Sequence, residues 1–288
     1  MFFRRLLLVG VLFFVFASTC HAQEWKGCLG GSGEQTQRIR EFSISVFRHP
    51  RADADEFQDE CIAEIKDRKG KPLFSSHDHG LEILPITGSD LNGDGEPGVV
   101  IEGYSGGAHC CWTYWIFSVG TSPRLLARIY NERGVFFEKI EGHKGITLVT
   151  LDGRFDYFDD MCHACSPFPS VYLRLEGNRL IDVSTEFWAK YQTEIEKASD
   201  EVSTTELSEF RNQWRKHQRG DLNTFEEIRG NVLNVVLGYL YAGKTSEAWK
   251  TLGEMWPASD FRRMKKLISK TRGKGFIAWA QDPSNFDD

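Results

Sequence analysis

The chain has 288 residues, with 35 Lys and Arg against 41 Asp and Glu, so its formal net charge is −6. This length allows one large domain or two modest ones. A mildly acidic chain is not built to bind phosphate backbones, so the composition argues against nucleic acid as a partner.

The first 22 residues have the features of an export signal. Arg4 and Arg5 are followed by a short apolar run, Leu6 to Ala17, which is brief for a membrane span. We expect cleavage between Ala22 and Gln23, and an uncleaved anchor is the alternative. The rest of the chain has no apolar run long enough to cross a bilayer. The sequence therefore predicts a periplasmic or secreted protein without a transmembrane segment.

Residues 23–185 predict a β-rich domain. Short apolar or alternating runs are separated by Gly, Asn, Asp and Pro, which is typical of an all-β unit. We expect propeller-blade-like or sandwich sheets. The runs that favour strands include 42–47, 81–86, 99–104, 111–119, 124–130, 146–151 and 171–175.

The stretch DLNGDGEPG at 90–98 predicts a metal-binding loop. Asp90, Asn92 and Asp94 alternate, so a tight turn can bring three oxygen ligands inward, and Glu96 can add another. Ca²⁺ prefers six to eight hard oxygen ligands, and we expect Glu102, the Glu96 side chain or water to complete the shell. A metal-free Asn-Gly/Asp-Gly hairpin turn is the alternative.

The segment ITGSDLNGDGEPGVVIE at 86–102 resembles the calcium loop of FG-GAP/VCBS-type repeats. Those repeats carry an acid at the ninth loop position, where this chain has Gly98. The resemblance therefore implies a weak calcium site that lacks one carboxylate. The continuation G-G-A-H-C-C at 106–111 is similar to uncharacterised exported bacterial proteins with the same acidic loop. That similarity implies export and a metal rather than an activity.

Of the seven cysteines, Cys20 leaves with the signal, and the others are Cys28, Cys61, Cys110, Cys111, Cys162 and Cys165. An even number in an exported chain favours disulfides, and Cys28 pairs most simply with Cys61. For the remaining four, three arrangements stay open: bonds between the two pairs, local bonds within each pair, and a zinc site with His109 or His163. A redox role for the C-H-A-C motif is a further alternative.

Four carboxylates precede the second cysteine pair, at Asp152, Asp156, Asp159 and Asp160. Paired carboxylates can act as acid and base in glycoside cleavage, so a cell-envelope hydrolase is the alternative function. A solvated loop is the simpler interpretation. The sequence has no phosphate loop, dinucleotide fingerprint, G-x-S-x-G or H-E-x-x-H, and we assign no catalytic residue.

Residues 186–288 predict an α-helical region. Capping boxes at Ser203–Glu206 and Asn223–Glu226 indicate helix starts, whereas Gly243 and Pro257 indicate ends. The last two helices are expected at 245–256 and 259–273. Gly238, Tyr241, Gly243 and Ala248 partly resemble a tetratricopeptide hairpin. The apolar faces are too large for one hairpin to bury, so this region should pack on the β-domain or bind a protein or envelope partner.

Together these features predict an α+β protein. Its β-rich N-terminal domain is followed by an α-helical C-terminal region, with a boundary near residue 185. We expect an exported, disulfide-bonded binding or structural module that calcium stabilises and that lacks catalytic activity.

Overall fold

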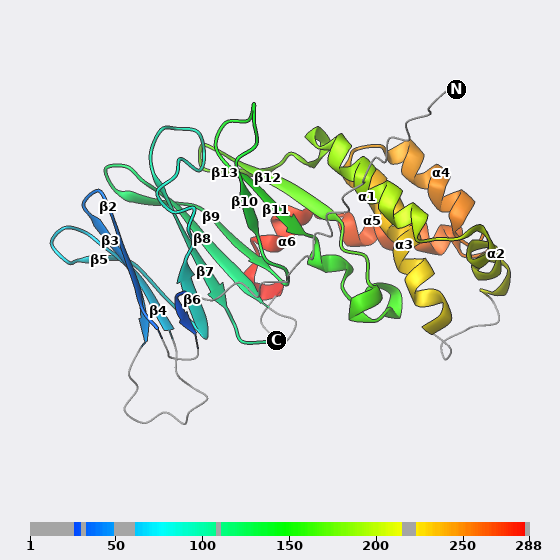
Figure 1. The fold of residues 1–288 in the computed structure, drawn as a ribbon, viewed down its shortest axis with the longest axis horizontal. Coiled ribbons are helices and arrows are strands. Elements are labelled where there is room, and N and C mark those ends of the chain that lie inside the picture. Colours follow the sequence, from blue (N-terminus) through cyan, green and yellow to red (C-terminus); the bar gives the residue numbers. More distant parts are fainter. Residues whose placement is uncertain (1–25, 30–32, 49–60, 108–110, 215–222, 286–288) are drawn as a thin grey trace, which may run out of the picture.

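The computed structural model describes residues 26–29, 33–48, 61–107, 111–214 and 223–285. The fold is α+β, as predicted: three antiparallel sheets form the N-terminal part and helices the C-terminal part. The sheets follow one another along the long axis of the molecule, and most of the helices lie beyond the third sheet (Figure 1). The expected signal segment, His109 and Cys110 lie outside the described residues.

The first sheet is a four-stranded meander in the order β2-β3-β4-β5. Its strands are β2 (Gln35–Ile39), β3 (Phe42–Arg48), β4 (Cys61–Lys66) and β5 (Pro72–Asp78). Alternation along β3 and β4 buries one face, on which Ile44 and Ile65 have no exposed surface. This face packs against Ile83, Ile101 and Phe117 of the second sheet.

The second sheet has the order β1-β6-β7-β8-β9. Its strands are β1 (Cys28–Leu29), β6 (Gly80–Ile83), β7 (Gly98–Tyr104), β8 (Trp112–Val119) and β9 (Pro123–Asn131). Both faces of β6, β7 and β8 are largely buried, because sheets lie on either side. Gln35 of β2 adds a direct link: its amide accepts from Ile83 N–H at 2.7 Å and donates to the Ile83 carbonyl at 2.9 Å.

The third sheet is a meander of β10, β11, β12 and β13. Its strands are β10 (Phe136–Glu138), β11 (Thr147–Leu151), β12 (Ser170–Glu176) and β13 (Arg179–Asp182). Three short 3-10 turns separate β11 from β12: η1 (Gly153–Phe155), η2 (Phe158–Asp160) and η3 (His163–Cys165). Each sheet thus contains the four-stranded meander that is also the topology of a propeller blade.

The helical region begins after a 3-10 turn, η4 (Ser184–Glu186). Its further elements are α1 (Trp188–Asp200), α2 (Thr204–Gln213), α3 (Asn223–Tyr241), α4 (Thr245–Met255), α5 (Phe261–Arg272), α6 (Phe276–Ala280) and η5 (Pro283–Asn285). The predicted capping box of α2 is confirmed, because Ser203 and Glu206 bond reciprocally. Within the described part of the chain, no helix is both long and apolar enough to cross a membrane.

The helices and the third sheet share one hydrophobic core. Leu148 of β11 and Leu173 of β12 belong to the same buried cluster as Leu233 and Leu237 of α3. Helix α3 also packs closely on α1, because a Cβ at Gly238 would lie 2.7 Å from Ile195 Cγ1. Gly238, one of the residues of the tetratricopeptide-like pattern, therefore lies against α1.

Candidate functional site

Asp90 organises the acidic loop between β6 and β7. Its Oδ1 accepts hydrogen bonds from the N–H groups of Gly93 and Asp94, at 2.7 and 3.1 Å, and its Oδ2 accepts from Gly95 N–H at 2.9 Å. Gly93 and Gly95 have φ values of +77° and +84°, which glycine adopts without strain. One carboxylate therefore holds the whole turn.

Asn92 and Asp94 lie together in this loop. Asn92 Nδ2 donates to Asp94 Oδ2 at 2.9 Å and to the Gly177 carbonyl at 3.2 Å. Asp94 Oδ1 accepts from Glu96 N–H at 2.9 Å. The loop therefore closes through its own hydrogen bonds, as in the metal-free turn, while keeping three predicted ligands close together.

The side chains of the other two predicted residues lie elsewhere. The Glu96 carboxylate forms an ion pair with Arg40, in the turn between β2 and β3. Glu102 lies in β7, directly opposite Glu82 of β6 and Tyr114 of β8. Because a strand rises about 3.3 Å per residue, Glu102 is roughly 13 Å along β7 from Gly98. The expectation that Glu102 completes the shell is not met in this arrangement.

The acidic loop meets turns from all three sheets. Glu96 pairs with Arg40 of the first sheet, and Asp94 lies 3.7 Å from Arg124 at the start of β9. The loop also accepts a hydrogen bond from Ile146 N–H to the Leu91 carbonyl at 2.9 Å, just before β11. The loop is therefore positioned to hold the sheets together at one end.

Two predicted disulfides are present. Cys28 of β1 bonds to Cys61 of β4, with Cα atoms 5.7 Å apart, and so joins the second sheet to the first. Cys162 bonds to Cys165, which is the local alternative for that pair. Cys111 is disulfide-bonded as well. The four-thiol zinc site is wrong for this form, because Cys162 and Cys165 bind each other.

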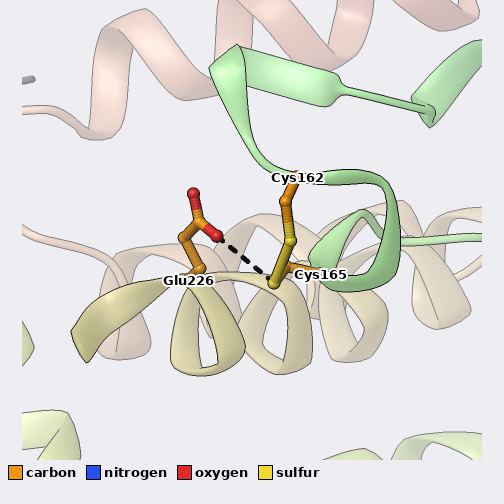
Figure 2. Close-up of side chains that lie close together, drawn as sticks. All are labelled: Cys162, Cys165 and Glu226. Carbon is orange, nitrogen blue, oxygen red and sulfur yellow. Dashed lines mark hydrogen bonds between the residues drawn. A yellow bond between two sulfur atoms is a disulfide. The ribbon is translucent and has the colours of Figure 1, made fainter. Parts of the chain in front are cut away.

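The Cys162–Cys165 bond lies beside a buried carboxylate on α3. Figure 2 shows Glu226 directed at Cys165, and Glu226 Oε2 lies 3.3 Å from Cys165 Sγ. In the part of the chain that the structure describes, these side chains form one group of three whose ligand atoms lie within 4.8 Å of one another. A disulfide offers no thiolate to a metal, so the oxidised form is not a metal site.

The acidic cluster connects the β-domain to the helices. Asp152 has no exposed surface and binds Arg154 Nε at 2.8 Å, while Tyr241 of α3 donates to it. Asp159 Oδ2 binds Arg229 of α3 at 2.8 Å and Arg263 of α5 at 2.9 Å. These carboxylates act as structural links.

Asp156 pairs with a histidine rather than with a guanidinium. It binds His163 Nδ1 at 2.8 Å, and His163 Nε2 lies 2.9 Å from Arg133 Nη2. Burial, together with the charge of Asp156, raises the pKa of Glu132 to about 7. Asp160, the last of the predicted cluster, lies in η2 with φ of +61°. The four predicted carboxylates therefore do not form one catalytic group.

A pocket of about 660 Å³ opens between the second and third sheets, beside the short edge strand β10. Its floor includes Glu82 and Glu102, which are cross-strand neighbours. Glu82 is only 4% exposed. The remaining lining residues are Leu84, Pro85, Ile86, Trp112, Tyr114, Gly134, Val135, Phe136 and Phe137.

The carboxylates of this pocket are hard to ionise. Burial raises the pKa of Glu102 to about 7, with a further increase from the charge of Glu82 and a decrease from its hydrogen bond with Tyr114. Burial also raises the pKa of Glu82. The Tyr114 hydroxyl is fixed from the other side, because it accepts from Val135 N–H at 2.9 Å. Near neutral pH the Glu102 carboxyl therefore keeps its proton more readily than an ordinary glutamate.

Sequence reasoning did not identify this pocket. A local signal exists, since LEIL at 81–84 and VVIEGY at 99–104 each place one acid inside an apolar strand. A buried charge of that kind requires a partner or a function. Only the register between β6 and β7 shows that Glu82 and Glu102 are opposite each other.

No protein-family model matches the chain, and no curated protein or solved structure matches it either. The resemblance of the acidic loop to FG-GAP/VCBS-type repeats stays a prediction.

Proposed function

We propose that the chain is an exported, disulfide-bonded binding module that calcium stabilises, and that the pocket beside β10 is its ligand site. One observation carries this proposal: Glu82 and Glu102 lie side by side at the floor of a cavity whose walls are mainly apolar. Small-molecule sites typically combine such walls with a few well-placed polar groups.

The chemistry of the pocket favours an organic amine with an apolar body. Two carboxylates on one floor repel each other, and a cation between them relieves that repulsion. Trp112 and Phe137 are among the lining residues, and aromatic side chains suit both an apolar body and a cation. An anionic ligand would meet the two carboxylates in the pocket lining.

The environment of the acidic cluster favours binding over hydrolysis. Asp152 and Asp159 are held by Arg154, Arg229 and Arg263. Each of these carboxylates is occupied by its ion pair with a guanidinium and serves as a structural link. We therefore do not assign hydrolysis to these residues.

Calcium is proposed to stabilise the module through the acidic loop. Asp90 and Asp94 supply carboxylate oxygens, and Asn92 would turn its amide so that the oxygen faces the ion. Arg40 and Arg124 already balance part of the negative charge. Calcium therefore competes with two guanidinium groups, which predicts weak affinity.

Calorimetric titration of residues 23–288 with phenethylamine and with its neutral analogue 2-phenylethanol tests the pocket. The amine should bind and the alcohol should bind at least about tenfold more weakly, a difference of about 1.4 kcal/mol. Glu102→Gln and Glu82→Gln should weaken amine binding, whereas Glu138→Gln, at an exposed position on β10, should not. Equal binding of amine and alcohol would reject a carboxylate-based site.

A further inference from the structure

We propose that Cys162–Cys165 is a redox-active disulfide that exchanges with a dithiol of a partner protein, and that Glu226 transfers the proton of Cys165. This activity is separate from the amine pocket and from the calcium loop. It rests on the different environments of the two sulfurs and on the position of Glu226.

The two cysteines differ in their accessibility. Cys162 is exposed, whereas Cys165 is half-buried against α3. An incoming thiolate must approach along the S–S axis, so access decides which sulfur is attacked. The exposed Cys162 is therefore the sulfur that a partner attacks, and Cys165 is the leaving group.

Glu226 is placed to serve that leaving group. It is 5% exposed, and its Oε2 lies 3.3 Å from Cys165 Sγ (Figure 2). A disulfide sulfur carries no hydrogen, so this contact is a hydrogen bond only when Cys165 is a thiol or Glu226 is protonated. Arg229, on the same helix, pairs with Asp159 instead. Among the described residues, the contact of Glu226 is thus with the leaving-group sulfur of the exchange.

Gly230 allows the turn that contains Cys165, η3, to approach α3 closely enough to contact Glu226. A Cβ at this position would lie 2.3 Å from the Cys165 carbonyl oxygen, so only glycine allows the turn to rest on the helix. Gly230 is four residues after Glu226 and therefore lies on the same face of α3. Glycine inside a helix is unfavourable by itself, and here the close approach of η3 requires it.

The exchange proceeds in two balanced steps. A partner thiolate attacks Cys162 Sγ, the Cys162–Cys165 bond breaks, and Cys165 leaves as a thiolate. Glu226 passes to Cys165 the proton that the second partner thiol releases, and that thiol becomes a thiolate. The second partner thiolate then attacks the partner sulfur of the mixed disulfide and releases Cys162. The partner dithiol loses two electrons and becomes a disulfide, and Cys162 and Cys165 gain them. A different disulfide-bearing partner reverses both steps.

Graded reduction of residues 23–288 with dithiothreitol tests the difference between the disulfides. Cys162–Cys165 should open while Cys28–Cys61, both of whose residues have no exposed surface, stays closed. Iodoacetamide added to the partly reduced protein should modify Cys162 before Cys165. Opening of both bonds at the same dithiothreitol concentration, or modification of Cys165 first, would overturn the proposal.

Oxidation of a dithiol peptide measures the activity itself. The intact chain should oxidise the peptide, and a Cys162→Ser/Cys165→Ser double variant, which keeps Cys28–Cys61, should not. Equal rates for the two proteins would overturn the redox role. Zinc binding by the reduced chain that requires Glu226, without peptide oxidation, would replace it by a metal site.

The role of Glu226 has a matched control on the same helix. Glu226→Gln should slow peptide oxidation about tenfold and change the pH dependence of the rate. The reason is that the Gln amide can form hydrogen bonds but cannot transfer a proton. Glu227→Gln, at an exposed position, should leave both unchanged. Circular dichroism should be the same for both variants. Identical pH profiles for the two would exclude Glu226 from the exchange.

Discussion

Tyr241 of α3 donates a hydrogen bond to Asp152, a carboxylate without exposed surface in the turn that follows β11. The same carboxylate binds Arg154, whose Nη1 donates to the Thr271 carbonyl of α5 at 3.2 Å. Burial and the Asp152 charge raise the pKa of Tyr241 well above its ordinary value, so the hydroxyl keeps its proton and donates. The third sheet and the helices are therefore joined by a buried polar network as well as by a shared core.

Tyr241→Phe should lower the free energy of unfolding by about 1–3 kcal/mol, since it leaves Asp152 without one buried donor. Urea unfolding followed by circular dichroism and by tryptophan fluorescence measures the change. Tyr239→Phe, at a half-buried position two residues earlier, should have a smaller effect. Equal stability of Tyr241→Phe and the unmodified chain would mean that this bond does not contribute.

Stability should decrease as pH rises from about 4.5 to about 7 because of Glu102. Its pKa is raised from 4.5 to about 7, so the folded state holds the proton more tightly than the unfolded state. The stabilisation that protonated Glu102 contributes is at its maximum below the unfolded-state pKa. It is lost as pH rises through the folded-state pKa. Each pKa unit corresponds to about 1.4 kcal/mol before solvent screening.

Glu102→Gln should therefore flatten the pH profile and stabilise the chain at about pH 8, since Gln stays uncharged. Glu132, whose pKa is also raised to about 7, keeps part of the slope in this variant. Thermal melts between about pH 4 and 8 measure how stability depends on pH, with Glu138→Gln as the control variant. A profile of Glu102→Gln that is as steep as that of the unmodified chain would contradict the assignment.

Calcium should raise the melting temperature. At a hundred times its dissociation constant, a ligand of the folded state adds about 2.7 kcal/mol, which is several degrees for a chain of this size. Melts with calcium, with magnesium and with chelator measure this effect. Asp94→Asn should abolish the calcium response while retaining an acceptor for Glu96 N–H. Identical melts in calcium and chelator would leave the loop as a hydrogen-bonded turn.

Removing the Cys28–Cys61 bond by a double change to Ala should destabilise the chain by about 3–4 kcal/mol, the loop-closure value for a separation of 33 residues. Thiol labelling of denatured, unreduced residues 23–288 should detect no free cysteine, and peptide mapping should recover the Cys28–Cys61 pair. Recovery of either residue linked elsewhere would show that the connectivity is wrong.

Much of the fold follows from local pattern. The runs at 42–47, 99–104 and 111–119 coincide with β3, β7 and β8, because strands buried on one or both faces must be apolar in a regular way. Strand β5 was not among the predicted runs. Its side chains are mostly accessible at the sheet edge, with Leu73 45% exposed, so burial leaves no apolar signature there.

Some of the site residues could also be predicted from local sequence, and others could not. Asp90, Asn92 and Asp94 are close in space because they are close in sequence, so their spacing predicts their proximity. Glu102 could complete the calcium shell only if the chain after Gly98 turned back towards the loop. Instead β7 is extended and carries Glu102 away from the loop. The contact of Cys165 with Glu226 joins residues 61 positions apart. Neither composition nor periodicity contains that information.

The Cys28–Cys61 bond also determines how the molecule would carry mechanical load. A force applied at residue 28 passes directly through the S–S bond to Cys61, so the intervening segment, including β2 and β3, carries no tension. Extension of the oxidised chain in a force spectrometer should therefore lack the length of those 33 residues, about 110 Å at full extension. Reduction should release that length, and tension then also passes through β2 and β3.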